Sequence, residues 1–120
     1  MSRRNNTALL AAQRAQAAVF AALGDRTRLQ LLGRLSLGEA CSISELSSDS
    51  AVTRQAITKH LGVLENAGLV KSERFGRETR FEFVPKPVEA MQVYLESVSK
   101  QWDAALTRLK NFVEKDPTRK

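Results

Sequence analysis

Three side chains at helical spacing carry hydrogen-bonding groups that can distinguish one DNA base from another. They are Gln55, Thr58 and Lys59, within a segment that runs from residue 53 to residue 68. A glutamine amide can pair with the edge of adenine, a threonine can contact several bases or a thymine methyl, and a lysine can reach guanine or a phosphate. Arg54 lies nearer the flank, where it is placed for a phosphate or the edge of the groove. These residue types predict contact with DNA.

Arginines gather in a predicted hairpin directly after that segment. Residues 69–74 and 79–84 read as two strands, with Arg77 on a glycine-containing tip and Arg74 and Arg80 along the tip and outer face. An arginine on such a tip suits a phosphate or a narrow minor groove. The full set of residues that we predict to contact DNA is Thr53, Arg54, Gln55, Thr58, Lys59, His60, Arg74, Arg77 and Arg80.

The single histidine and the single cysteine indicate no other chemistry. His60 lies between the buried and exposed faces of its helix, so a hydrogen bond at the edge of the core is favoured over base contact. No nucleophile or orienting acid is identifiable beside it, which argues against a catalytic base. Cys41 precedes a helix start, but a small buried residue is favoured over a redox-sensing thiolate. One Cys and one His cannot complete a tetrahedral metal site, so we expect no metal. Since no phosphate-binding loop or catalytic triad is recognisable either, we expect no cofactor and no enzymatic activity.

Local capping signals predict the helix that precedes the DNA-contacting segment. Ser42 and Glu45 fit a capping box, which predicts a helix through about Ser48. Asp49 and Ser50 then favour a turn. A second, longer helix follows from a threonine cap, which makes the pair a helix-turn-helix.

The second helix has a buried side and a defined end. Ile57, Leu61 and Leu64 recur at helical spacing, so burying them turns the polar residues of the helix outward. Gly68 is predicted to end the helix in a left-handed conformation, with Leu69 packing on Leu64 in a Schellman motif.

The hairpin decides the fold class. Alternation in its second strand puts Phe81 and Phe83 on the core side and Arg80 and Glu82 outward. Many helical proteins contain an amphipathic helix pair with a polar face, but a basic hairpin directly after such a pair is far less common. Residues 42–84 therefore predict a mainly α winged helix-turn-helix with a small two-stranded β-hairpin, the wing.

Both ends of the chain read as helices with more apolar surface than one small core can cover. A long amphipathic helix is predicted over about 88–114, and an alanine-rich helix over about 7–23. We predict that both form a homodimer interface, although packing of the last helix within its own chain is the alternative. The predicted interface residues are Leu9, Phe20, Met91, Tyr94, Leu95, Val98, Trp102, Leu106, Leu109 and Val113.

A further helix is predicted between the first helix and the helix-turn-helix. Asp25 can cap its start, and Leu29, Leu32 and Leu35 read as core residues. Arg28 is interpreted as a possible phosphate contact.

Two protomers related by symmetry would set their recognition helices about 34–36 Å apart, matching half-sites one DNA turn apart.

Four blocks of sequence, in order, resemble ArsR-type (ArsR/SmtB-like) bacterial transcriptional regulators. They are residues 22–29, 57–61, 64–70 and 76–78, and the resemblance covers about residues 18–113. It implies a homodimeric, cytoplasmic repressor that binds a palindromic operator, usually near its own gene, and leaves it when an effector arrives.

The chain departs from the metal-sensing members of that family. Those members carry a Cys-x-Cys-type pair or Asp/His pairs on the last helix, whereas this chain has Cys41 alone and no histidine near its C-terminus. Trp102, Leu106 and Leu109 resemble the pattern of a non-metal branch. The resemblance implies an effector that is not a metal, such as a small molecule of undefined identity.

Composition agrees with a polyanion as partner. The chain has 120 residues and a formal net charge of +6, which predicts one domain over residues 1–120 with a bias toward phosphates. Residues 51–84 hold six Lys/Arg against four Glu, so ordinary solubilising charge remains an alternative explanation. No membrane span and no signal peptide is recognisable, and we expect a cytoplasmic protein.

These features predict a sequence-specific DNA-binding transcriptional regulator that acts as a repressor of a promoter near its operator. Two alternatives stay open. One is a winged helix that docks a protein through the face from Gln55 to Lys59, and the other is an architectural binder that does not distinguish DNA sequences.

Overall fold

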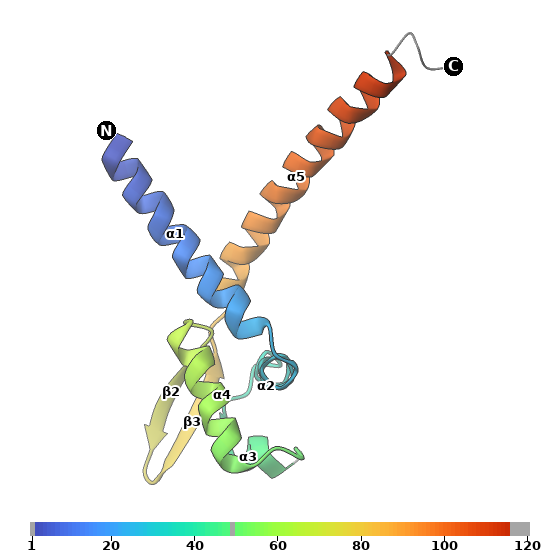
Figure 1. Cartoon of the computed structure of the whole chain (residues 1–120). Coiled ribbons are helices and arrows are strands. Elements are labelled where there is room, and N and C mark those ends of the chain that lie inside the picture. Colours follow the sequence, from blue (N-terminus) through green and yellow to red (C-terminus); the bar gives the residue numbers. More distant parts are fainter. Residues whose placement is uncertain (1, 49, 116–120) are drawn as a thin grey trace. The chain divides into compact units, whose positions relative to one another are not determined.

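The computed structural model describes residues 2–48 and 50–115 and contains a small sheet among helices (Figure 1). Residues 1–89 and 90–120 form two compact units. Asp49, one of the two residues predicted to form the turn, lies outside the described residues. The elements are α1 (Ser2–Leu23), α2 (Arg26–Leu35), β1 (Cys41–Ser42), α3 (Ile43–Ser48), α4 (Arg54–Asn66), β2 (Val70–Phe75), β3 (Glu78–Phe83) and α5 (Lys86–Glu114).

The sheet has three antiparallel strands in the order β1-β3-β2, one more than the sequence predicted. The additional strand pairs Cys41 with Phe81 and Ser42 with Arg80. Two residues are too few to show the alternation by which strands are recognised, and Ser42 also belongs to the capping box. Gly76, with φ of 64°, begins the two-residue loop of the hairpin, as a type II′ turn requires.

The predicted helix starts are confirmed by their hydrogen bonds. The backbone N–H of Ser42 donates to Oε1 of Glu45 at 3.0 Å, and the backbone N–H of Glu45 donates to Oγ of Ser42 at 3.1 Å. At α4, the hydroxyl of Thr53 accepts from the N–H of Ala56 at 3.1 Å. Both helices of the helix-turn-helix therefore begin where the sequence places them.

The predicted Schellman ending of α4 is also confirmed. Gly68 has φ of 78°, its N–H donates to the carbonyl of Glu65, and the N–H of Leu69 donates to the carbonyl of Leu64, both at 2.9 Å. Leu64 and Leu69 are fully buried. The N–H of Val84 donates to the carbonyl of Leu69 at 2.8 Å, which joins the end of the hairpin to the end of the helix.

The core forms where α2, α3, α4 and the sheet meet. Ile57 and Leu61 of α4 are fully buried, as predicted, and Leu31 of α2 is buried beside Leu32 and Leu35. Leu29, predicted to be a core residue, is 53% exposed. At 100° per residue, the buried stripe of α2 runs through Arg28, so Leu29 points outward.

The long helices leave apolar side chains uncovered. In α1 only Val19 and Ala22 are buried among the residues with described side chains, and α5 has no buried residue at all. Trp102 is 64% exposed and Leu106 is 57% exposed. Within the described ranges, no helix combines the length and apolar character needed to cross a membrane.

Candidate nucleic-acid interface

The predicted base-contacting residues lie on the exposed face of α4. Gln55, Thr58 and Lys59 are exposed, while Ile57 and Leu61 on the other side have no exposed surface. The hydroxyl of Thr58 donates to the carbonyl of residue 54 at 2.8 Å, so its oxygen lone pairs and methyl group remain for an outside partner. The helix therefore presents an amide, a methyl-bearing hydroxyl and an ammonium together.

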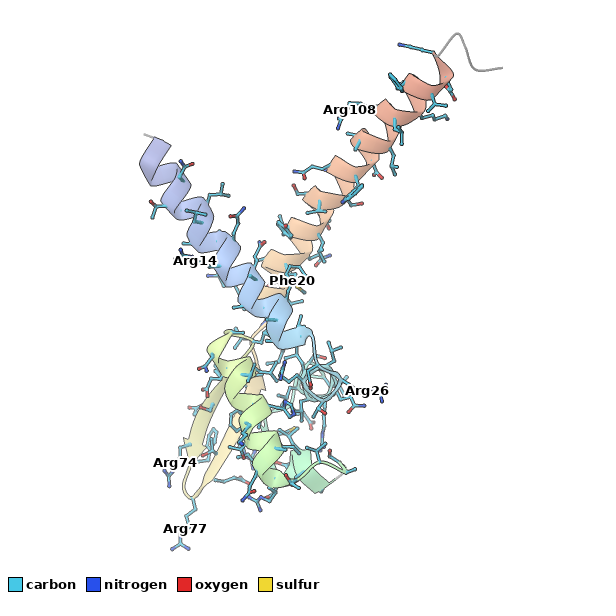
Figure 2. The ribbon with its side chains drawn as sticks, in the orientation of Figure 1. Arg14, Phe20, Arg26, Arg74, Arg77 and Arg108 are labelled. Carbon is cyan, nitrogen blue, oxygen red and sulfur yellow. The ribbon has the colours of Figure 1, made fainter. Side chains whose placement is uncertain are left out.

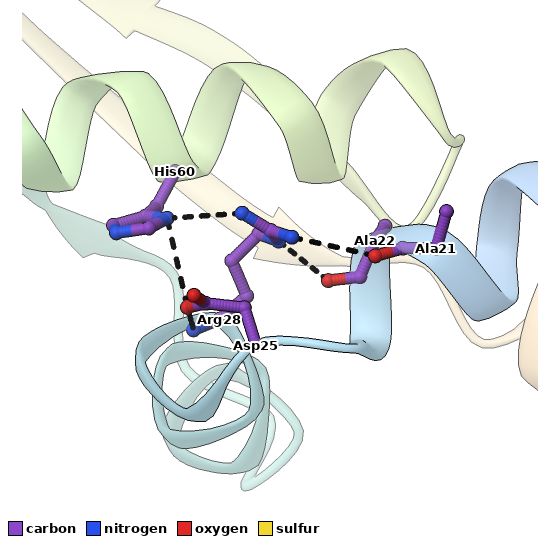
Figure 3. A network of polar contacts seen from close by, with 5 residues as sticks. All are labelled: Ala21, Ala22, Asp25, Arg28 and His60. Atoms are coloured by element: carbon purple, nitrogen blue, oxygen red, sulfur yellow. Dashed lines mark hydrogen bonds and ion pairs between the residues drawn. The ribbon is translucent and has the colours of Figure 1, made fainter.

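His60 faces inward, into a network that connects α4 with α1 and α2 (Figure 3). The guanidinium of Arg28 donates through Nε to the carbonyl of Ala22 at 2.6 Å and through Nη2 to that of Ala21 at 3.3 Å. Its Nη1 lies 3.3 Å from Nδ1 of His60, which in turn is 3.8 Å from Oδ2 of Asp25. The prediction that His60 makes a hydrogen bond at the edge of the core is confirmed.

The same network corrects the interpretation of Arg28 as a phosphate contact. Its guanidinium is occupied by the last carbonyls of α1 and by the imidazole, so it holds protein elements together. Asp25 caps α2, as predicted, by accepting the N–H of Arg28 at 3.0 Å. That hydrogen bond is the main reason why the pKa of Asp25 lies below its ordinary value, which keeps the cap ionised.

Two of the three wing arginines extend from the tip of the hairpin, as Figure 2 shows for Arg74 and Arg77. Nε of Arg74 donates to the carbonyl of Gly76 at 3.1 Å. Arg80 differs because its Nε lies 3.0 Å from Oε2 of Glu78, and its guanidinium lies 5.8 Å from the centroid of the Phe75 ring. The hydrogen bond to Glu78 raises the pKa of Arg80, so this cation is already paired within the wing.

The sequence predicts that the wing arginines line the tip and outer face together, and the structure corrects this prediction. Arg74 shares a face of β2 with Ser72, whose hydroxyl donates to Oε2 of Glu65 in α4 at 2.7 Å. Arg80 pairs with Glu73, one residue away along β2, and so lies on the opposite face. Arg74 therefore belongs to the side of the sheet that α4 covers, and Arg80 belongs to the outer face.

A polar hollow lies between α3, the start of α4 and the wing, and the sequence did not predict it. Its volume is about 290 Å³, and it brings Arg54 together with Arg77. The remaining lining residues are Ser42, Ile43, Ser44, Glu78 and Thr79. No local pattern could have shown it, because the β1–β3 pairing brings these segments together.

Cys41 is a buried thiol, which confirms the favoured interpretation of this residue. It is 7% exposed and donates to the carbonyl of Glu39 at 3.5 Å. Burial is the main cause that raises its pKa, so the thiol stays protonated. In the described part of the chain, no group of three His, Cys, Asp or Glu side chains is arranged to hold a metal ion.

Known proteins share this arrangement. Residues 23–73 match a family model described as a helix-turn-helix domain. The uncharacterised HTH-type transcriptional regulator YuzN of Bacillus subtilis (strain 168) is 44% identical over 78 residues, which cover 60% of this chain and 85% of YuzN. The structure of an ArsR-like transcriptional regulator from Rhodococcus sp. RHA1 matches with a TM-score of 0.76 and 36% identity, covering 87% of this chain and 97% of that one. The chain belongs to the ArsR family.

As an ArsR-family member, the protein is a helix-turn-helix DNA-binding transcriptional regulator and not an enzyme. The four sequence blocks resemble ArsR-type regulators, and the comparisons confirm this family. A transcriptional repressor SmtB homolog of a Synechocystis species is 32% identical over 77 residues, covering 64% of this chain and 56% of that protein. In this ArsR-family chain, α4 is the second helix of the helix-turn-helix and the β2–β3 hairpin is the wing.

Proposed function

We propose that this ArsR-family protein is a repressor that binds a palindromic operator as a homodimer and reads its bases with Gln55, Thr58 and Lys59. The observation that carries the proposal is the division of α4 into a fully buried apolar side and an exposed polar side. A helix held in this way can enter a major groove without exposing its core. Arg77 at the wing tip would contact the backbone beside it.

The exposed apolar surface of the long helices supports the homodimer. The apolar residues of α5 recur along a helix of 29 residues, about 44 Å long, and none of them is buried. Such a stripe is stable in water when another apolar surface covers it. A second copy of the chain supplies that surface by symmetry, and it also places a second α4 on the same DNA.

Effector release completes the proposed mechanism. The buried, protonated Cys41 and the single His60, held by Arg28, support an effector that is not a metal. A small molecule that prefers a different dimer geometry would lower the affinity for the operator by population shift. The repressor named among the relatives supports the sign of regulation. A bacterial regulator that acts on operator DNA would work in the cytoplasm.

Selection of duplexes from a randomised library, followed by fluorescence anisotropy, tests this function. We expect the selected duplex to bind about a thousandfold or more tightly than a scrambled duplex at equal salt. Lys59→Ala should weaken binding to the selected duplex about tenfold to a hundredfold. Lys100→Ala, which removes an exposed lysine from α5, should not change it.

Two results would replace the proposal. Equal and steeply salt-dependent binding to both duplexes would indicate an architectural DNA binder. No binding to either, with an intact fold, would favour a winged helix that docks a protein through the exposed face of α4.

A further inference from the structure

We propose that the hollow between α3, α4 and the wing is the seat of one DNA backbone phosphate, which Arg54 and Arg77 grip together. The inference deepens the proposed function and rests on it. It assigns a joint role to two arginines that the sequence placed separately, one at the edge of the groove and one at the wing tip. It also adds Ser44 and Thr79 as hydroxyl donors.

The two arginines approach the hollow from different elements. Arg54 is the first residue of α4, and Arg77 lies in the loop between β2 and β3. Both line the same space of about 290 Å³, with Ser44 of α3 and Thr79 of β3. Figure 2 shows Arg77 projecting from the tip, which leaves its guanidinium free to turn toward a bound strand.

The charge balance of the hollow favours an anion. In the described part of the chain, no hydrogen bond or ion pair neutralises the guanidinium of either Arg54 or Arg77. The one carboxylate among the lining residues is Glu78, and its Oε2 is held by Nε of Arg80 at 3.0 Å. Two arginines without a partner among the described residues therefore border one space, and a phosphodiester bound there can accept hydrogen bonds from both guanidinium groups through its two free oxygens.

A phosphate at this position would set the register of the protein on DNA. Contacts to phosphates orient a protein on the duplex, whereas contacts to bases determine the sequence that it prefers. Arg54 precedes the base-contacting residue Gln55 directly, so a phosphate held there fixes how α4 enters the groove. Loss of the grip should weaken binding to every sequence and leave the preference among sequences unchanged.

Salt dependence separates one shared phosphate from two independent ones. The association constant would be measured over a range of salt concentrations for the wild type, Arg54→Ala, Arg77→Ala and the double variant. Each phosphate that a protein neutralises adds about 0.9 to the slope of log K against log salt on duplex DNA. The homodimer has two such hollows, one per half-site, so if the two arginines of each protomer share one phosphate the double variant loses about 1.8 in slope, and each single variant loses less.

Two controls sharpen the test. Arg108→Ala removes an exposed arginine from α5, labelled in Figure 2, and should leave the slope unchanged. Neutral methylphosphonates, placed one at a time in the selected duplex, should weaken binding by the wild type at each contacted phosphate, and one of these positions per half-site should be the phosphate in the hollow. Substitution at that position should have no effect on the double variant.

The outcomes distinguish this inference from the function on which it rests. A loss of about 3.6 in the slope of the double variant, with each single variant losing about 1.8, would mean two independent phosphates per half-site and would overturn the shared phosphate while leaving DNA binding intact. A wild-type protein that binds no duplex would overturn the proposed function, and this inference with it.

Discussion

Nη1 of Arg28 lies 3.3 Å from Nδ1 of His60, and this contact connects the start of α2 to the middle of α4. An arginine can only donate hydrogen bonds, so Nδ1 of His60 can act only as the acceptor in this contact. The same guanidinium holds the last carbonyls of α1. One side chain therefore sets three helices relative to each other, and the placement of α4 depends on it.

Arg28→Lys should destabilise the protein although it keeps the charge. An ammonium cannot reproduce the planar fork that reaches Ala21, Ala22 and His60 together. Loss of the two part-buried hydrogen bonds, to Ala22 and His60, is expected to lower the free energy of unfolding by about 1–3 kcal/mol in urea titrations. The matched change at exposed Arg26 should cost less than about 0.5 kcal/mol. Equal effects of the two changes would show that the network contributes no stability.

Gly68→Ala and Gly62→Ala should have opposite effects, although both glycines lie in or beside α4. Gly68 has φ of 78°, and an added Cβ would meet only Cγ of Pro87 at an ordinary 3.7 Å. The left-handed backbone conformation at residue 68, and not a steric clash, should therefore make alanine cost about 1–2 kcal/mol of folding free energy. Gly62 lies within the helix with nothing within 4 Å, so alanine should stabilise it by about 0.8–1.0 kcal/mol. Thermal unfolding of both variants measures the difference, and a stabilising Gly68→Ala would contradict the Schellman ending.

Glu45→Gln should flatten the loss of stability in acid. Hydrogen bonds from the backbone and hydroxyl of Ser42 lower the pKa of Glu45 below its ordinary value. The unfolded chain then binds the proton more readily, so stability is fully present above about pH 4.3 and is lost as the pH falls through the lower folded pKa. Glutamine can still accept the N–H of Ser42 but does not titrate. Urea unfolding between pH 3 and pH 6 should show a smaller decline than the wild type, and parallel declines would contradict this role.

Trp102→Glu should separate the protomers if α5 forms the interface. Trp102 is 64% exposed in the single chain, so a charge there costs nothing within the protomer but would be buried unpaired in a dimer. Light scattering should give twice the monomer mass for the wild type and the monomer mass for the variant. Lys100→Glu, on the other side of α5, is the control and should stay dimeric. Trp102 is also the only tryptophan, so its emission should shift to longer wavelength on dilution.

Elements that depend on neighbouring residues could be predicted from the sequence. The capping box at Ser42 and Glu45, the threonine cap of α4 and the ending at Gly68 each involve contacts within a few residues. The buried side of α4 was also predicted, because 13 residues give its apolar spacing a clear phase. The exposure of Gln55, Thr58 and Lys59 followed from that phase.

Features that depend on distant contacts could not be predicted in the same way. The ten residues of α2 leave the phase of its apolar face ambiguous, so the sequence predicts Leu29 as core and Arg28 as surface, the reverse of what the structure shows. Arg74 and Arg80 lie on opposite faces because Arg74 pairs with Thr79, the residue before Arg80. The predicted strands 69–74 and 79–84 imply the same pairing, so the predicted shared outer face did not follow from the hairpin. The hollow that Arg54 and Arg77 share exists only because β1 pairs with β3.

The Schellman ending has a consequence for how the molecule opens. α4 ends at Asn66 and β2 begins at Val70, and the residues between them are themselves held by hydrogen bonds to Glu65, Leu64 and Val84. This connection is short and fully hydrogen-bonded, so the wing cannot separate from α4 without breaking the last turn of the helix. The backbone N–H groups of α4 and the wing should consequently exchange with solvent with the same opening free energy, because the two elements open together as one cooperative unit.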